Sequence, residues 1–108
     1  MNGKTGRFEA ERMLLIALLA QQLHEWLPGC QARSPAQLLD GLPENLPRFH
    51  TTLHQDLLPY LTAMRVDAAN TELLMAIFDE RLRSAADVLE RILRHRIEAA
   101  KPEDYHIQ

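Results

Sequence analysis

The sequence predicts an all-α protein: a small helical bundle of three main helices plus one short helix, with a long C-terminal helix, assembled as a dimer. Three observations support this fold class. Only four of the 108 residues are glycine and six are proline, while strong helix formers such as leucine, alanine and glutamate dominate. Two long segments repeat apolar residues at the three- and four-residue spacing of a helix face. A third segment, Met13 to Ala20, is apolar at all eight positions.

Length and composition indicate one globular domain. A chain of 108 residues, 46% hydrophobic and 25% charged, can bury a single modest core and lacks the composition of a disordered protein. We expect one helical domain over residues 1–108, with frayed tails at 1–6 and 102–108. The formal net charge of −3 provides no general attraction to nucleic acid or to an anionic membrane. The single cysteine, Cys30, excludes an internal disulfide and is typical of a reducing compartment.

The apolar octet 13–20 does not have the flanks of a targeting segment. Glu9 and Glu11 stand where a signal peptide carries positive charge, and Leu18 stands where its cleavage site needs a small residue. A membrane span needs about 20 apolar residues, whereas a pair of glutamines ends this run after eight. We therefore expect a cytoplasmic protein that does not enter a membrane.

The first two helices are delimited by turn and cap signals. The first is expected from about residue 5 or 8 to residues 26–27, before the Pro-Gly stop signal at 28–29. A short helix is expected over residues 35–40, because Ser34 can act as its N-cap and Gln37 can complete a capping box. Gly41 suits the left-handed position after that helix, and residues 42–47 are expected to be a connector in which Asn45 can cap the next helix.

The last two helices are predicted from apolar spacing. A helix is expected over residues 46–65, with apolar side chains at 46, 49, 53, 57, 60 and 64. Pro59 lies inside this pattern, and because the spacing keeps its phase we expect one kinked helix. The long C-terminal helix is expected from a cap at Asp67, Asn70 or Thr71 to residues 99–100. Its apolar residues at 75, 78, 82, 85, 89 and 92 form a heptad seam.

No segment carries a signature of catalysis. The phosphate-binding glycine loops and the serine nucleophile elbow are missing, so we expect no enzyme, no catalytic residue, no cofactor and no small-molecule substrate. Cys30 follows a Pro-Gly turn with no helix N-terminus to activate it, and we expect a plain loop or partly buried thiol. The arginines of the last helix alternate with acids, which favours a solvated face over binding of nucleic acid.

His50 and His54 are the strongest candidates for metal binding. Their four-residue spacing lets two imidazoles on one helix face share a metal ion. Folding would have to add further ligands, for which the candidates are His24, Asp56, Glu72 and His95. Two histidines alone do not define a site, so we expect half-exposed residues beside the apolar stripe and assign no metal. A metal-binding protein or metalloenzyme that uses His50 and His54 is the alternative.

The apolar surface of the first and last helices is the main functional signal. In a bundle of three main helices one side of the octet 13–20 would stay in water, which soluble monomers rarely allow. We expect this face to form a homodimer or to bind a helix of a protein partner in a groove; a compact monomer covered by the short helix is the other possibility. The expected interface residues are Met13, Leu14, Leu15, Ile16, Leu18, Leu19, Leu23, Trp26, Leu74, Phe78, Leu82, Leu89 and Ile92.

The segment "ANTELLMAIFDERLRSAADVLERIL", residues 69–93, resembles the last long helix of bacterial flagellar and type III export chaperones of the FlgN and FliT kind. The three prolines at 43, 47 and 59 and the short helix depart from the pattern of that family. The resemblance implies a small helical chaperone that binds an amphipathic segment of an export substrate or regulator. The matching positions are Asn70, Leu73, Leu74, Leu82 and Leu89.

The sequence thus favours a protein that works by binding another protein. We expect a small cytoplasmic regulator or chaperone that masks an apolar helical surface of its partner. An anti-activator that blocks dimerisation of a transcription factor and an export chaperone are two examples. A purely structural helical subunit is a further alternative.

Overall fold

The computed structural model describes residues 2–100, which form three helices: α1 (Asn2–Trp26), α2 (Pro35–Ala63) and α3 (Ala68–Ala100). This part of the chain has no strand, which confirms the all-α prediction and the long C-terminal helix. α1 begins inside the region expected to be a frayed tail, whereas the tail expected at 102–108 lies outside the described residues. None of the three helices is long and apolar enough to cross a membrane within the described residues.

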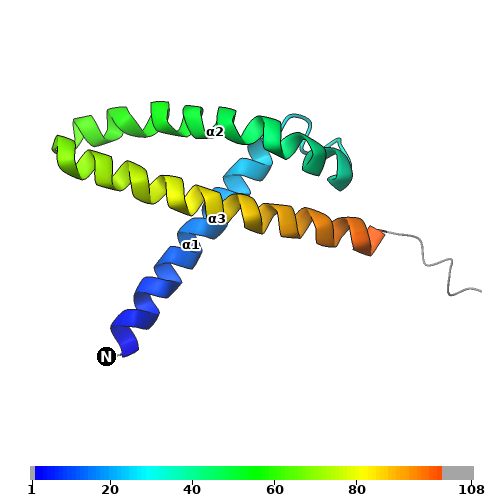
Figure 1. Cartoon of the computed structure of the whole chain (residues 1–108), viewed down its shortest axis with the longest axis horizontal. Coiled ribbons are helices and arrows are strands. Elements are labelled where there is room, and N and C mark those ends of the chain that lie inside the picture. The colour runs from blue at the N-terminus through cyan, green and yellow to red at the C-terminus, as the bar shows by residue number, and fades with distance from the viewer. Residues whose placement is uncertain (1, 101–108) are drawn as a thin grey trace, which may run out of the picture.

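The helices form two layers. α2 and α3 lie antiparallel as a hairpin, and α1 crosses α3 obliquely on one side of that hairpin (Figure 1). The shortest dimension of the molecule is 17 Å, close to the thickness of two packed helices at a spacing of about 8–10 Å. α3 packs against both other helices, while α1 and α2 touch only at a few positions. Each helix therefore keeps at least one open face.

The predicted helix caps are present. The Ser34 hydroxyl accepts the Gln37 backbone N–H at 3.3 Å, and the Gln37 side-chain oxygen accepts the Ser34 N–H at 3.0 Å, which is a complete capping box. Of the three candidate caps for α3, Asp67 is the one used, because its carboxylate accepts the Asn70 N–H at 2.8 Å.

The prediction of a separate short helix is wrong. Residues 35–40 are the first turns of α2, which continues to Ala63. Leu38, Leu42, Asn45 and Phe49 are spaced by four, three and four residues and are all buried on one face, so a break at Gly41 would take Leu38 and Leu42 out of the core. Asn45 is not a cap for a new helix; its amide donates to the Gly41 carbonyl at 2.8 Å.

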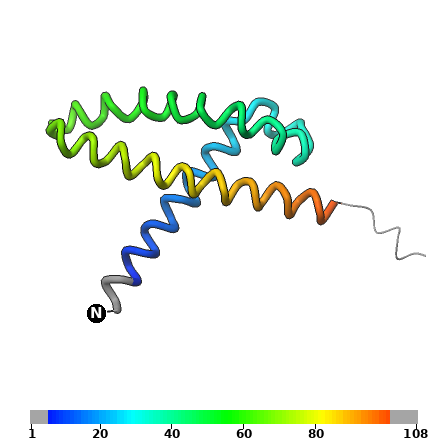
Figure 2. The backbone as a smooth tube through the Cα atoms, in the orientation of Figure 1, coloured from blue at the N-terminus to red at the C-terminus, as the bar shows by residue number. Residues whose placement is uncertain are grey.

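Three prolines inside α2 are tolerated because they lie on its solvent side. Pro43, Pro47 and Pro59 are all exposed. Each removes one backbone hydrogen bond and crowds a carbonyl one turn earlier, and carbonyls on the solvent side of a helix can turn towards water. The tube in Figure 2 accordingly shows α2 arched over α3, with its convex side outwards. The expectation that the helix continues through Pro59 is confirmed, because α2 extends to Ala63.

The core lies where all three helices meet. Trp26 of α1 and Phe49 of α2 pack edge to face there, with ring centroids 5.6 Å apart. A second, smaller cluster of Ile16, Leu19, Ala20 and Ala85 fills the crossing of α1 and α3. The buried residues of the main cluster are Leu23, Leu27, Leu38, Leu42, Phe49, Leu82, Ala86, Leu89 and Leu93.

Candidate protein-binding site

The expected interface residues fall into three groups by exposure. Five of them are buried in the protein's own core: Ile16, Leu19, Leu23, Leu82 and Leu89. Leu15, Trp26, Leu74 and Phe78 are half-buried. Met13, Leu14, Leu18 and Ile92 are exposed, so these four are available to a partner without rearrangement of the helices.

The first exposed surface is the outer row of α1, which consists of Arg7, Glu11, Leu14, Leu18, Gln21 and Glu25. These residues follow one another at spacings of four, three, four, three and four, and all six are exposed. At 3.6 residues per turn, this row lies on the side of α1 opposite Ile16 and Leu23, which face the core. Leu14 and Leu18 form its apolar centre, and the Gln21 amide donates to Glu25 at 3.3 Å near one end.

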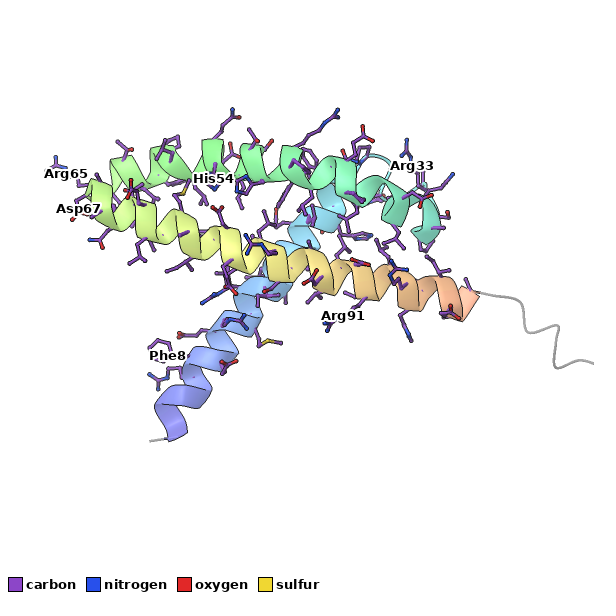
Figure 3. All side chains as sticks on the ribbon, viewed as in Figure 1. Phe8, Arg33, His54, Arg65, Asp67 and Arg91 are labelled. Carbon is purple, nitrogen blue, oxygen red and sulfur yellow. The ribbon has the colours of Figure 1, made fainter. Side chains whose placement is uncertain are left out.

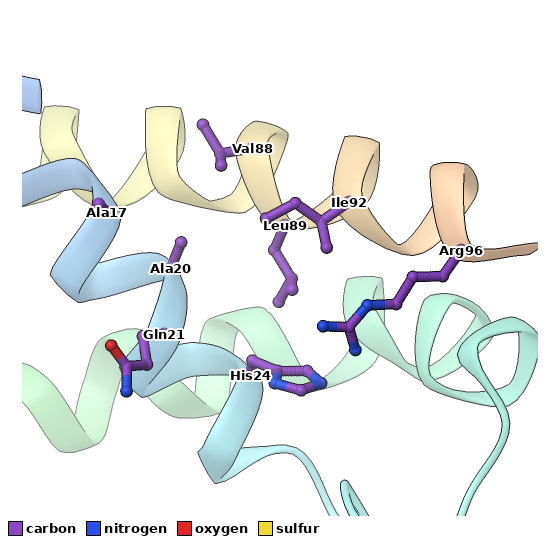
Figure 4. A pocket seen from close by; sticks show the side chains of 8 residues that line it. All are labelled: Ala17, Ala20, Gln21, His24, Val88, Leu89, Ile92 and Arg96. Atoms are coloured by element: carbon purple, nitrogen blue, oxygen red, sulfur yellow. The ribbon is translucent and has the colours of Figure 1, made fainter. Parts of the chain in front are cut away.

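The second surface is a groove between α1 and the C-terminal half of α3, shown in Figure 4. We call this hollow of about 240 Å³ the α1–α3 groove. Its walls are mainly apolar, while Gln21, His24 and Arg96 supply polar groups (Figure 4). Nε2 of His24 is buried and has no hydrogen-bond partner within residues 2–100. The lining residues are Ala17, Ala20, Gln21, His24, Val88, Leu89, Ile92 and Arg96.

The groove continues towards the N-terminus of α1. Val88 also lines a neighbouring hollow that includes Met13 of α1 and Arg91 of α3, so the two hollows meet at this side chain. Met13 and Ile92, at the two ends, are 55% and 40% exposed. Met13, Val88 and Ile92 thus form an apolar strip along the α1–α3 crossing, bordered by arginines and, in the second hollow, also by Asp87.

An ion-pair cluster fixes the crossing of α1 and α3. Arg12 donates to the Glu80 carboxylate at 3.2 Å, and Arg81 pairs with the same carboxylate. The hydrogen bond from Arg81 lowers the pKa of Glu80, and the bond from Arg12 lowers it further against the raising effect of desolvation. One partner comes from α1 and two from α3, so the cluster links the two helices beside their crossing.

A separate cluster joins α2 to α3. Nε2 of His50 and Nε2 of His54 lie 2.8 Å and 2.6 Å from the same oxygen, Oδ1 of Asp79. The two imidazole rings are stacked with a tilt of 39° and a centroid distance of 4.3 Å, and Figure 3 shows His54 on the side of α2 that faces α3. Partial burial raises the pKa of Asp79, but hydrogen bonds and charge from His54 and His50 lower it by more.

Sequence reasoning missed three of these residues. Asp79 stands four residues before Arg83, which is the spacing of a helix-surface ion pair, but within the described chain its Oδ1 bonds to the two histidines. Ala17 lies in the apolar octet and Arg96 is one of the arginines of the last helix, but the sequence does not show that folding brings the two together in one groove. Cys30, expected to be a plain loop or partly buried thiol, is half-buried, and its Sγ donates to the backbone carbonyl of Glu25 at 3.5 Å.

No protein-family model matches this chain, and no curated protein or solved structure is found to be similar to it. A proposal for the function of this chain therefore has to be argued from the surfaces described above. The α1–α3 groove combines apolar walls with a few polar groups at one end, as binding sites for apolar helices and ligands commonly do.

Proposed function

We propose that the protein is a non-enzymatic regulator or chaperone of the cytoplasm that binds an amphipathic helix of a partner protein in the α1–α3 groove. The observation that carries this proposal is the apolar strip from Met13 to Ile92, which lies between two helices and is bordered by arginines and by Asp87. A helix laid into such a groove buries its own apolar face, which is how a chaperone or an anti-activator masks a partner surface.

The chemistry of the groove selects the partner helix. Val88 and Ile92 favour aliphatic side chains at three- or four-residue spacing. Arg96 favours an acidic side chain at the end where the groove becomes polar. The unpartnered Nε2 of His24 can form a hydrogen bond to the same polar group. We therefore expect a partner helix with an aliphatic face and a carboxylate at one end of that face.

We further propose that the outer row of α1 joins two copies of the chain. Suppose that two α1 helices pair antiparallel about a two-fold axis that crosses the outer row at the level of residue 16. Residue i of one copy then faces residue 32 − i of the other. Leu14 then faces Leu18, Glu11 faces Gln21, and Arg7 faces Glu25 of the second copy. The row is thus self-complementary, with leucines at the centre and opposite charges at the ends, as an interface with two-fold symmetry requires.

The two surfaces are compatible with each other. The groove residues Ala17 and Ala20 and the outer row lie roughly a third of a turn apart around α1. The two surfaces share only Gln21, at the edge of the groove, so a dimer joined by the outer row would leave the rest of each groove open for a partner helix. Figure 3 shows Phe8 on the part of α1 that extends beyond α3, where a second copy can approach α1.

The groove can be tested by site-specific crosslinking in cells. A photo-crosslinking amino acid at Ala17, in the groove, should capture a discrete partner, whereas the same group at Ala36, an exposed position on α2, should not. Ile92→Glu should weaken the captured complex at least tenfold, since a buried aliphatic side chain contributes about 1.5–3 kcal/mol. Leu58→Glu is the matched control, because Leu58 is exposed but lies outside the groove.

The partner's crosslinked segment should then bind the purified protein as an isolated helical peptide. Binding that Arg96→Glu weakens and a charge-reversed peptide restores would support the proposed orientation. Equal crosslinking from Ala17 and Ala36, or capture unaffected by Ile92→Glu, would contradict the groove as a binding site. A purely structural subunit would then be the better interpretation. An export chaperone, as the resemblance of residues 69–93 implies, would be supported if the captured partner is an export substrate.

A further inference from the structure

We propose that His50, His54 and Asp79 form a binding site for a divalent transition metal ion, for which Zn²⁺ is the best fit, and that the ion links α2 to α3. The inference does not depend on the proposed partner groove, which lies between α1 and α3. It depends on one geometric fact: three potential ligand atoms from two helices converge within 4.8 Å of one another.

The distances are close to those of a metal site. Tetrahedral coordination with bonds of about 2.0–2.2 Å places neighbouring ligand atoms about 3.3–3.6 Å apart. The two histidine nitrogens lie 2.8 Å and 2.6 Å from Oδ1 of Asp79. Each nitrogen therefore has to move away from the oxygen by less than about 1 Å to admit an ion. Rotation of the side chains can supply such a shift without a change in the helices.

The local structure holds the ligands together. His50 and His54 are one helical turn apart on α2, so their side chains project from the same face. Asp79 approaches both from α3, and a single histidine would already satisfy one of its oxygen atoms. Two imidazoles on the same carboxylate oxygen are more than a helix–helix hydrogen bond needs, and they provide the second nitrogen ligand that a metal ion requires.

The donor set selects the class of metal. Two imidazole nitrogens and one carboxylate suit Zn²⁺ and similar transition ions, whereas Mg²⁺ and Ca²⁺ prefer sites made of oxygen atoms. Three protein ligands leave at least one coordination position for water. His50 and Asp79 also border an open hollow lined by Leu46, Pro47, Leu82 and Arg83, through which water and the ion can reach the site. All three ligands are between 31% and 42% exposed.

The position of the site suggests what the ion would do. On α2 the buried residues end at Phe49, and on α3 they begin at Leu82. The cluster therefore lies at the border between the three-helix core and the free end of the α2–α3 hairpin. An ion held there would cross-link the two helices beyond the last buried side chains.

Calorimetric titration of the purified full chain with ZnCl₂, after treatment with a chelator, tests the site. We expect one Zn²⁺ per chain, no heat of binding with MgCl₂, and a dissociation constant at least tenfold weaker in both Asp79→Asn and His54→Gln. His95→Ala, which changes an exposed histidine elsewhere on α3, should bind as the unchanged protein does. Circular dichroism of each variant shows whether its helices are retained.

A second measurement keeps the test independent of the variants. In the unchanged protein, Zn²⁺ should shift the Nε2 resonances of two histidines in ¹⁵N NMR spectra and raise the melting temperature in a concentration-dependent manner. Absence of Zn²⁺ binding by the unchanged protein, or equal binding by Asp79→Asn, would overturn the proposal. In that case the cluster is an ion pair only, and the proposed partner groove is unaffected.

Discussion

Within residues 2–100, two residues adopt the left-handed backbone conformation, and one of them is not glycine. Gly29, in the turn after α1, has φ of 68°, and Arg65, after α2, has φ of 61°. Arg65 ends α2 in a Schellman motif. Its N–H donates to the Thr62 carbonyl and the N–H of Val66 donates to the Leu61 carbonyl, both at 3.0 Å. A side chain with a β-carbon makes this conformation unfavourable by about 1–2 kcal/mol.

Substitutions at these two positions should have opposite effects. Arg65→Gly should stabilise the protein by about 0.5–1 kcal/mol, because relief of the left-handed strain exceeds the entropy that glycine adds to the unfolded chain. Gly29→Ala should destabilise it by about 1–2 kcal/mol, because alanine introduces the same strain. Denaturant unfolding followed by circular dichroism measures both. Stabilisation by Gly29→Ala would show that the turn does not adopt the left-handed conformation.

At the residue scale, the sequence placed the histidines correctly but not their partner. His50 and His54 were expected to be half-exposed beside the apolar stripe, and they are. Asp79 has a basic residue four positions later, which is the pattern of a helix-surface ion pair. Whether Asp79 pairs with Arg83 on its own helix or with the histidines of α2 depends on the register between α2 and α3. That register is set by tertiary packing.

At the scale of the elements, α2 is the helix whose extent the sequence misjudged. The polar Asn45 interrupts the apolar spacing, and Gly41, Pro43 and Pro47 are all ordinary stop signals. Burial of Leu38 beside the other helices outweighs these local signals. The long α3 and the end of α1 were predicted correctly because strong periodicity and a Pro-Gly turn agree there with the tertiary contacts.

The continuity of α2 has a measurable consequence. Leu38 is only 4% exposed, so Leu38→Ala should lower the free energy of unfolding by about 2–5 kcal/mol. Leu58→Ala, in the same helix at 49% exposure, should change it by less than about 1 kcal/mol. Chemical denaturation of the two variants provides the comparison. Equal and small effects would mean that residues 35–42 do not pack into the core.

At the scale of the whole molecule, α1 has a different role on each side. Ile16 and Leu23 face the core, Met13 and Ala17 border the α1–α3 groove, and Leu14 and Leu18 lie on the outer row. This division accounts for an octet that is apolar on every side. The sequence identified the octet as exceptional but could not assign its sides, because the assignment depends on how α1 is rotated against α3.

The charges at the ends of the outer row permit a test of the antiparallel pairing. Arg7→Glu and Glu25→Arg should each weaken the dimer several-fold, because each places like charges opposite one another in the two symmetric pairs. The double variant Arg7→Glu/Glu25→Arg should recover affinity, since it restores opposite charges at both ends. Sedimentation velocity at low salt measures the dissociation constant of the dimer for each variant. Additive losses in the double variant would exclude the proposed register.

The central claim is that the exposed apolar sides of α1 are interfaces. For the outer row of α1, the most direct test is the mass of the protein in solution. Light scattering after size exclusion should give about 25 kDa, twice the 12.4 kDa of one chain, at tens of micromolar. Leu18→Glu should give the mass of a single chain, while Leu58→Glu, which changes an equally exposed leucine of α2, should remain a dimer. A monomeric unchanged protein, or a dimer that persists in Leu18→Glu, would contradict the account.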